Sequence, residues 1–193
     1  MSVLKTILSP SERVGRVFAL AVSSFGWGCL PLIVLGLILS ACSSPPKSSG
    51  DDAARLALAI GTLSPVIDPV EARRAAEMMT KESLRLAEQY EVVQPAWFHN
   101  VLVNSGVRER GLCYHWVNDL LRVLNEESFR SLVFYRGGAK LGTYQEHNTV
   151  VVAAYGDRFE NGLVVDAWRY QGRLFWIRVR GDELRWQELV PAP

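Results

Sequence analysis

The chain has 193 residues, of which 49% are apolar and 21% are charged, and its formal net charge is +1. This composition excludes an intrinsically disordered chain, which combines few apolar residues with a large net charge. It also argues against a nucleic-acid partner, because 21 Lys and Arg residues are balanced by 20 Asp and Glu residues and form no basic cluster. The part of the chain after residue 50 is long enough to bury one sizeable core, so we expect a single domain there.

The amino-terminal part of the chain differs sharply from the rest in charge. Three basic residues precede a segment, residues 17–46, that contains no Asp, Glu, Lys or Arg. A basic segment followed by an apolar run and then by small residues is typical of a secretory signal peptide. We therefore expect residues 1–41 to be removed on export and to contribute nothing to the fold.

The end of the apolar run closely resembles the lipobox of bacterial lipoproteins. Residues 39–42 read Leu-Ser-Ala-Cys, and the Ser-, Pro- and Gly-rich residues 42–50 follow as a predicted flexible tether. The resemblance implies that the chain is cleaved before Cys42 and that this cysteine is acylated. Its lipid would anchor the protein to a membrane of the bacterial cell envelope, facing the periplasm and most simply on the outer membrane.

An uncleaved transmembrane helix is the alternative for this segment, because about 20 apolar residues suffice to span a bilayer. Gly26, Gly28 and Pro31 interrupt the run, and the lipobox stands at its end, which favours the signal peptide. Both interpretations anchor the domain outside the cytoplasm.

In the segment 51–193, helical patterns come first and strand patterns follow. Apolar residues at helical spacing predict helices over about 51–63, 69–91, 95–103 and 112–124. β-Branched and aromatic runs between Gly and Asp turns predict strands over 131–135, 149–155, 162–168, 173–179 and 184–189. The connections between these strands are too short for crossover helices, so we expect an α+β domain with amino-terminal helices packed on a mainly antiparallel sheet.

Cysteine usage leaves a single thiol in the mature domain. Cys29 lies in the signal segment and Cys42 is the expected lipidation site, so Cys113 has no partner for an intramolecular disulfide. Cys113 stands where a glycine-containing loop gives way to a predicted helix. Free backbone N–H groups and the positive end of the helix dipole stabilise a thiolate there and can bind an oxyanion. Cys113 is therefore a candidate nucleophile, with simple core packing as the alternative.

Among the three histidines of the chain, the sequence favours one as the base. His115 lies two residues beyond Cys113, about 200° around the same predicted helix, and so points away from the thiol. His99 lies in an apolar helix with no visible partner. His147 begins a predicted strand, and Asp166 lies within the next one, where a buried carboxylate needs a partner. Antiparallel pairing of these strands would bring His147 and Asp166 within hydrogen-bond reach.

The order Cys, His, Asp, with the cysteine at a helix start and the other two residues on successive strands, resembles the transglutaminase-like branch of the papain-like cysteine hydrolases. Residues 111–114, Gly-Leu-Cys-Tyr, are similar to the family's nucleophile turn, and residues 165–168, Val-Asp-Ala-Trp, to its strand-borne aspartate. The resemblance covers about residues 95–180 and implies a papain-like core.

By this resemblance, Cys113 attacks an amide carbonyl, His147 accepts the thiol proton and later returns it to the leaving amine, and Asp166 orients the imidazole. The chain departs from the family's pattern after the histidine. The family usually has an aromatic residue two positions after the histidine, whereas here His147 is followed by Asn148-Thr149.

Two functions remain open from the sequence. One is a membrane-tethered, cysteine-dependent amide hydrolase or acyltransferase acting on peptides or other amides, and the other is a non-catalytic envelope lipoprotein that serves as a binding or assembly module. Neither calls for a cofactor. A zinc site made by Cys113, His115 and His147 is disfavoured, because a fourth ligand is missing and the spacing fits no zinc pattern.

A second donor to an oxyanion stays undecided at this level. Asn104, Asn118 and Gln145 are the candidates, and each also fits an ordinary loop or surface role.

Overall fold

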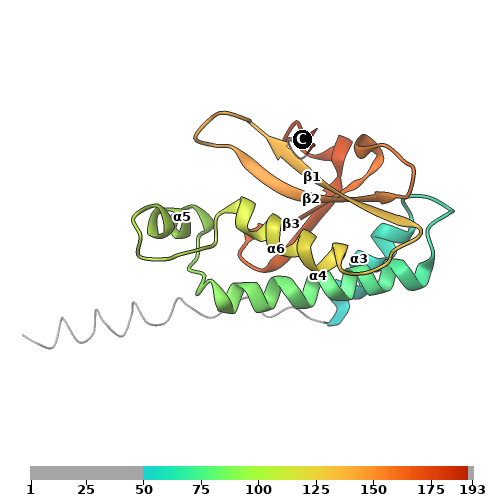
Figure 1. Cartoon of the computed structure of the whole chain (residues 1–193), viewed down its shortest axis with the longest axis horizontal. Coiled ribbons are helices and arrows are strands. Elements are labelled where there is room, and N and C mark those ends of the chain that lie inside the picture. The colour runs from blue at the N-terminus through green and yellow to red at the C-terminus, as the bar shows by residue number, and fades with distance from the viewer. Residues whose placement is uncertain (1–49, 191–193) are drawn as a thin grey trace, which may run out of the picture. The chain divides into compact units, whose positions relative to one another are not determined.

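The computed structural model describes residues 50–190, which form helices first and a sheet afterwards (Figure 1). The helices are α3 (Gly50–Gly61), α4 (Pro69–Gln89), α5 (Ala96–Asn104) and α6 (Cys113–Asn125). The strands are β1 (Leu132–Ala139), β2 (His147–Ala154), β3 (Leu163–Tyr170), β4 (Arg173–Arg178) and β5 (Gln187–Glu188), with short 3₁₀ turns η1 (Phe159–Asn161) and η2 (Val179–Gly181). The expected signal peptide, Cys42 and the tether before Gly50 lie outside the described residues.

The strands form one antiparallel sheet in the order β4-β3-β2-β1-β5. The described residues therefore confirm the predicted α+β class. Within this part of the chain, no helix is both long enough and apolar enough to cross a bilayer.

β1 runs farther than its sequence pattern predicts. Gly137 and Gly138 continue the strand and pair with Thr149 and Asn148 of β2. A side chain on Gly137 would come within 3.1–3.3 Å of Thr149, Phe159 and Val151, so the strand passes closely under its neighbours at this point. Glycine has a low strand propensity, which is why the sequence pattern ended β1 too early.

The long helix α4 has the start signals that its sequence predicts. The side chain of Asp68 accepts a hydrogen bond from the backbone N–H of Val70 at 2.8 Å, and Pro69 occupies the first turn. Small and apolar residues spaced along one face of the helix are buried against the sheet and α6, among them Ala72, Ala75, Ala76, Met79 and Leu86. These contacts fix α4 beneath the sheet.

The two faces of the sheet bury different sets of side chains. Val150, Val152 and Val165 belong to the main core that contains the residues of α4 and α6. Val151 and Val164 belong to a second cluster, covered by Phe159, Val179 and Trp186. Because both faces are covered, all eight residues of β2 are buried, and an apolar run replaces the usual alternation.

Candidate active site

Cys113 is the first residue of α6, as the preceding glycine-containing loop predicts. The first N–H groups of an α-helix have no acceptor within the helix and carry the positive end of its dipole. The thiol of Cys113 is half-buried and lies 3.9 Å from the backbone carbonyl oxygen of Glu146, the residue that precedes β2. Cys113 therefore faces the start of the strand that carries the candidate base.

Gly111 shapes the turn that delivers Cys113. Its φ of +123° belongs to the region that favours glycine, and an added Cβ would lie 2.1 Å from Nε2 of His99. His99 is fully buried, and its Nε2 lies 2.9 Å from the carbonyl oxygen of Arg110. The role of His99, for which the sequence shows no partner, is thus to hold the backbone just before the cysteine.

Two side chains of α6 hold the same turn from the other side. Nδ1 of His115 accepts hydrogen bonds from the N–H groups of Gly111 at 3.1 Å and Leu112 at 3.3 Å. The indole of Trp116 donates to the carbonyl oxygen of Gly111 at 3.0 Å. Burial lowers the pKa of His115, which keeps its ring neutral and able to accept these bonds. His115 thus binds the backbone at the start of its own helix, a contact that the sequence did not predict.

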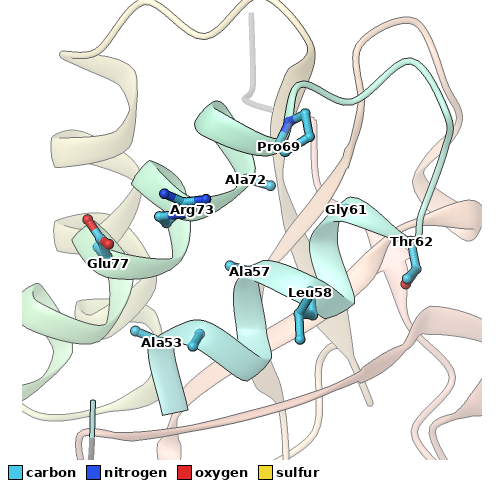
Figure 2. A pocket seen from close by; sticks show the side chains of 10 residues that line it. Ala53, Ala57, Leu58, Gly61, Thr62, Pro69, Ala72, Arg73 and Glu77 are labelled. Carbon is cyan, nitrogen blue, oxygen red and sulfur yellow. The ribbon is translucent and has the colours of Figure 1, made fainter. Parts of the chain in front are cut away.

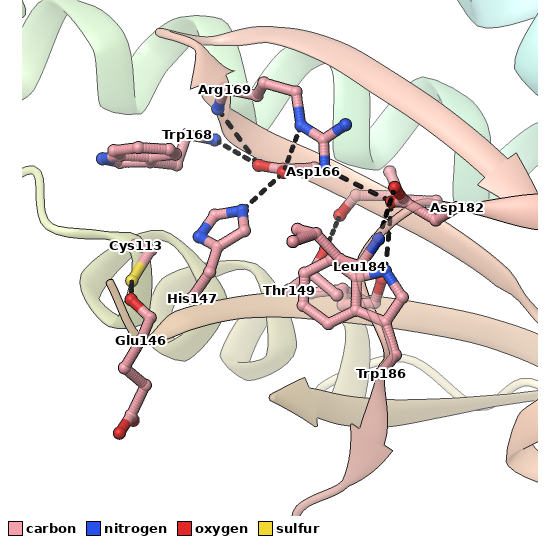
Figure 3. Close-up of polar contacts among 12 residues, drawn as sticks. Cys113, Glu146, His147, Thr149, Asp166, Trp168, Arg169, Asp182, Leu184 and Trp186 are labelled. Carbon is pink, nitrogen blue, oxygen red and sulfur yellow. Dashed lines mark hydrogen bonds and ion pairs between the residues drawn. The ribbon is translucent and has the colours of Figure 1, made fainter. Parts of the chain in front are cut away.

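His147 and Asp166 meet on one face of the sheet. Val151 pairs with Val164, so by alternation His147 and Thr149 share a face with Asp166. Nε2 of His147 lies 2.7 Å from Oδ2 of Asp166 (Figure 3). The structure therefore brings together the two residues that the sequence proposed as partners.

The carboxylate of Asp166 is 1% exposed, so its charge needs compensation from several sides. Its Oδ1 accepts hydrogen bonds from the backbone N–H groups of Trp168 at 3.0 Å and Arg169 at 3.1 Å. Nε of Arg169 adds a contact to Oδ2 at 3.2 Å. A register shift in β3 after Asp166 turns these groups toward the carboxylate.

Asp182 supports this network from beyond the strands. Its Oδ2 accepts from Nη2 of Arg169 at 3.3 Å and from the indole of Trp186 at 3.0 Å (Figure 3). Burial raises the pKa of Asp182, but the hydrogen bonds from Trp186 and Leu184 and the charge of Arg169 outweigh it and hold the pKa below its ordinary value. The negative charge of Asp182 thereby keeps Arg169 directed at Asp166.

The imidazole of His147 is placed to exchange a proton with the thiol. With Nε2 on Asp166, the other ring nitrogen, Nδ1, is turned toward Cys113 (Figure 3). Burial on its own lowers the pKa of His147, but the hydrogen bonds with Asp166 and Cys113 outweigh it and raise the pKa to about 9. The ring centroids of Trp168 and Trp186 lie 4.8 and 5.4 Å from that of His147. These surroundings therefore favour the protonated form of the His147 imidazole.

Cys113 and His147 open into a cleft of about 580 Å³. One wall is the face of α5 that carries Trp97, Asn100, Val101 and Asn104. The opposite wall is the loop between β1 and β2, with Lys140, Tyr144, Gln145 and Glu146, and the segment 182–184 borders it. Of the three amides considered from sequence, Asn104 and Gln145 line this cleft, whereas Asn118 bonds to Arg136 and borders a different cavity.

A larger hollow, of about 740 Å³, lies between α3 and α4 (Figure 2). Its lining is mostly alanine and other apolar groups, with Arg73 and Glu77 as its charged members. It contains no cysteine or histidine, so it offers no nucleophile or proton-transfer group of the kind found beside Cys113.

Sequence reasoning missed four contributors to the site, namely Asn100, Arg169, Asp182 and Trp186. In the sequence, Asp182 and Trp186 resemble ordinary turn and hairpin residues, and only their tertiary contacts reveal their role.

Within residues 50–190, no three His, Cys, Asp or Glu side chains are grouped so as to hold a metal ion.

Comparison of the chain with protein-family models, with curated proteins and with solved structures finds no match. The function therefore has to be argued from the site itself.

Proposed function

We propose that the protein is a cysteine-dependent amide hydrolase or acyltransferase with a papain-like, transglutaminase-like core. The observation that carries this proposal is the arrangement around His147, whose Nε2 lies 2.7 Å from Oδ2 of Asp166 while Nδ1 faces Cys113. A nucleophile, a base and a group that orients the base are thus supplied by α6, β2 and β3.

Each residue has a definite step in the reaction. The Cys113 thiol gives its proton to Nδ1 of His147, and the thiolate adds to the amide carbonyl carbon. When the tetrahedral intermediate collapses, the C–N bond breaks and the leaving amine takes the proton from Nδ1. Water or an acceptor amine then gives a proton to His147 and attacks the thioester, which releases the acyl product and the thiol. Asp166 holds the imidazole throughout and stabilises its charged form.

The setting of the site supports an extended amide substrate, such as a peptide. The side chains of Trp97 and Tyr144 stand on opposite walls of the cleft and are 64% and 96% exposed. An exposed aromatic side chain offers a large contact surface to a chain that passes along the cleft. The proposal places this domain in the cell envelope, tethered to a membrane by lipid on Cys42 and facing the periplasm.

The direct test is the rate at which iodoacetamide alkylates Cys113 at about pH 6, where an ordinary thiol is almost wholly protonated. We expect fast labelling in the full-length, detergent-solubilised protein and a loss of about tenfold or more in a His147→Ala variant. A Cys113→Ser variant measures labelling elsewhere in the chain. Slow labelling that does not depend on His147 would remove the catalytic function and favour a tethered binding module.

A further inference from the structure

We propose that Asn100 donates a hydrogen bond from Nδ2 to the carbonyl oxygen of the acyl substrate and, with the backbone N–H of Cys113, stabilises the oxyanion. The inference rests on the proposed function and assigns a substrate-contacting residue that neither the Cys-His-Asp order nor the sequence candidates include. It depends on three observations: the orientation of the Asn100 amide, the position of Asn100 in the cleft, and the hydrogen bonds or positions that make the other nearby amides less suitable.

The orientation of the Asn100 amide is fixed by its neighbour. The indole N–H of Trp168 donates to Oδ1 of Asn100 at 3.0 Å. An indole nitrogen can only donate, so the atom that meets it must be the amide oxygen and not the amide nitrogen. The NH₂ group of Asn100 therefore lies at the other end of the amide, where it can act only as a donor.

The position of Asn100 connects it with the reacting groups. Asn100 lines the same cleft as Cys113 and His147. The ring of Trp168 packs on that of His147 with centroids 4.8 Å apart, while its N–H edge holds Asn100. The indole of Trp168 thus contacts both the base, His147, and the proposed donor, Asn100. Because the indole is rigid, it holds the two side chains in a fixed relative position.

The other amides near the site are less suited to this role. Gln145 is engaged at both ends, because its Oε1 accepts from Lys140 at 3.0 Å and its Nε2 donates to the Tyr144 hydroxyl at 3.2 Å. Asn118 bonds to Arg136 outside the cleft. Asn104 is the last residue of α5, and its side chain is exposed. Among these side chains, Asn100 alone is held by an aromatic ring that also packs on His147.

The chemical step needs a donor of this kind. When the thiolate of Cys113 adds to the carbonyl carbon, the C=O π pair moves onto oxygen, and that negative charge is stabilised by preorganised N–H groups. The charge returns to the C=O bond when the C–N bond breaks. Because the amide of Asn100 is already oriented, it contributes without reorganisation during the reaction.

Two reactions of the same thiol separate this role from a structural one. Acylation by p-nitrophenyl acetate passes through an oxyanion, whereas alkylation by iodoacetamide displaces iodide at a saturated carbon and forms none. We expect Asn100→Ala to slow acylation by about 10²-fold, the usual cost of removing one oxyanion donor, and to change alkylation by less than about twofold. Asn118→Ala, a change of the same residue type outside the cleft, serves as the control and should alter neither rate.

A second variant tests the orienting bond. Trp168→Phe keeps an aromatic ring beside His147 but removes the N–H that holds Asn100. We expect an intermediate loss of acylation with alkylation largely retained. If the Asn100→Ala protein is unstable, this variant still tests the proposal, because it keeps the Asn100 side chain and removes only the hydrogen bond that orients it.

The outcomes are distinguishable. An equal fall of both rates in Asn100→Ala, or no fall in either, would overturn the role of Asn100 while wild-type alkylation still depended on His147. If wild-type alkylation showed no such dependence, the proposed function itself would fail, and this inference with it.

Discussion

The two large hollows of the domain differ in what their walls contain. The hollow between α3 and α4 measures about 740 Å³ and the cleft at Cys113 about 580 Å³. The candidate site is therefore the smaller of the two. Alanine faces and an exposed Leu58 line the former, whereas a thiol and an imidazole meet in the latter. The comparison shows why convergent polar groups, and not volume, select the Cys113 cleft as the candidate site.

The difference has an energetic side. Burial of the Asp166 carboxylate would be unfavourable without partners, yet it is 1% exposed and accepts hydrogen bonds from His147, Arg169 and two backbone N–H groups. The α3–α4 hollow contains no such arrangement of compensated charge. This arrangement of compensated charge is what the proposed role of Asp166, to orient His147, requires.

The largest expected effect is on turnover of p-nitrophenyl acetate in a Cys113→Ala variant. Removal of the nucleophile should lower the rate by at least about 10³-fold. The thiol is half-buried, so the midpoint of thermal unfolding should change little. Ester turnover and calorimetry check this prediction. An unchanged rate would transfer the chemistry to another residue.

Two glycines, one beside each hollow, test the backbone next. Gly111→Ala should lower the free energy of unfolding by about 2–4 kcal/mol, because φ is +123° and the new Cβ would clash with His99. Gly61→Ala is the matched change in the α3–α4 hollow, where nothing lies within 4 Å. It should change the unfolding free energy by less than about 1 kcal/mol. Urea denaturation measures both, and equal effects would contradict the role assigned to the Gly111 turn.

The raised pKa of His147 predicts a pH dependence. The pKa is about 9 in the folded protein and 6.5 in the reference state, so stabilisation of the folded state by imidazolium is complete below 6.5 and is lost as the pH rises through 9. Turnover, which needs a protonated imidazole to release the amine, should fall above a pH of about 9. The pH profile of amide or anilide turnover measures this limb. A limb near the ordinary pKa of histidine would contradict the contacts assigned to His147.

The smallest expected effect belongs to the α3–α4 hollow. Leu58→Gln changes a side chain that is 71% exposed in that hollow. We expect alkylation and acylation of Cys113 to stay within about twofold and the unfolding free energy within about 0.5 kcal/mol. A marked loss of either reaction would mean that the α3–α4 hollow affects the chemistry at Cys113, which would contradict its assignment as a hollow separate from the site.

Much of the fold follows from local patterns in the sequence, because helix starts and apolar runs are local properties. Asp68-Pro69 predicts the start of α4, and the change from helical patterns to β-branched and aromatic runs predicts the α+β class. The extension of β1 through Gly137 and Gly138 could not be predicted, since it depends on the close approach of β2.

The site divides in the same way. Cys113, His147 and Asp166 could be selected because a helix start, a strand start and a buried acid each leave a local signal. The contacts of Asn100 with Trp168 and of Asp182 with Arg169 join residues 68 and 13 positions apart, and no local pattern encodes them. The lipid anchor on Cys42 stays a prediction.

The most direct test of the central claim is the titration of the His147 imidazole, followed by NMR in the wild-type protein and in Cys113→Ala. The contact of His147 with both Asp166 and Cys113 predicts a pKa of about 9 for His147 in the wild type and a lower value in the variant, where only Asp166 still raises it. A wild-type pKa at or below 6.5, or the same value in both proteins, would contradict the pairing of Cys113 with His147.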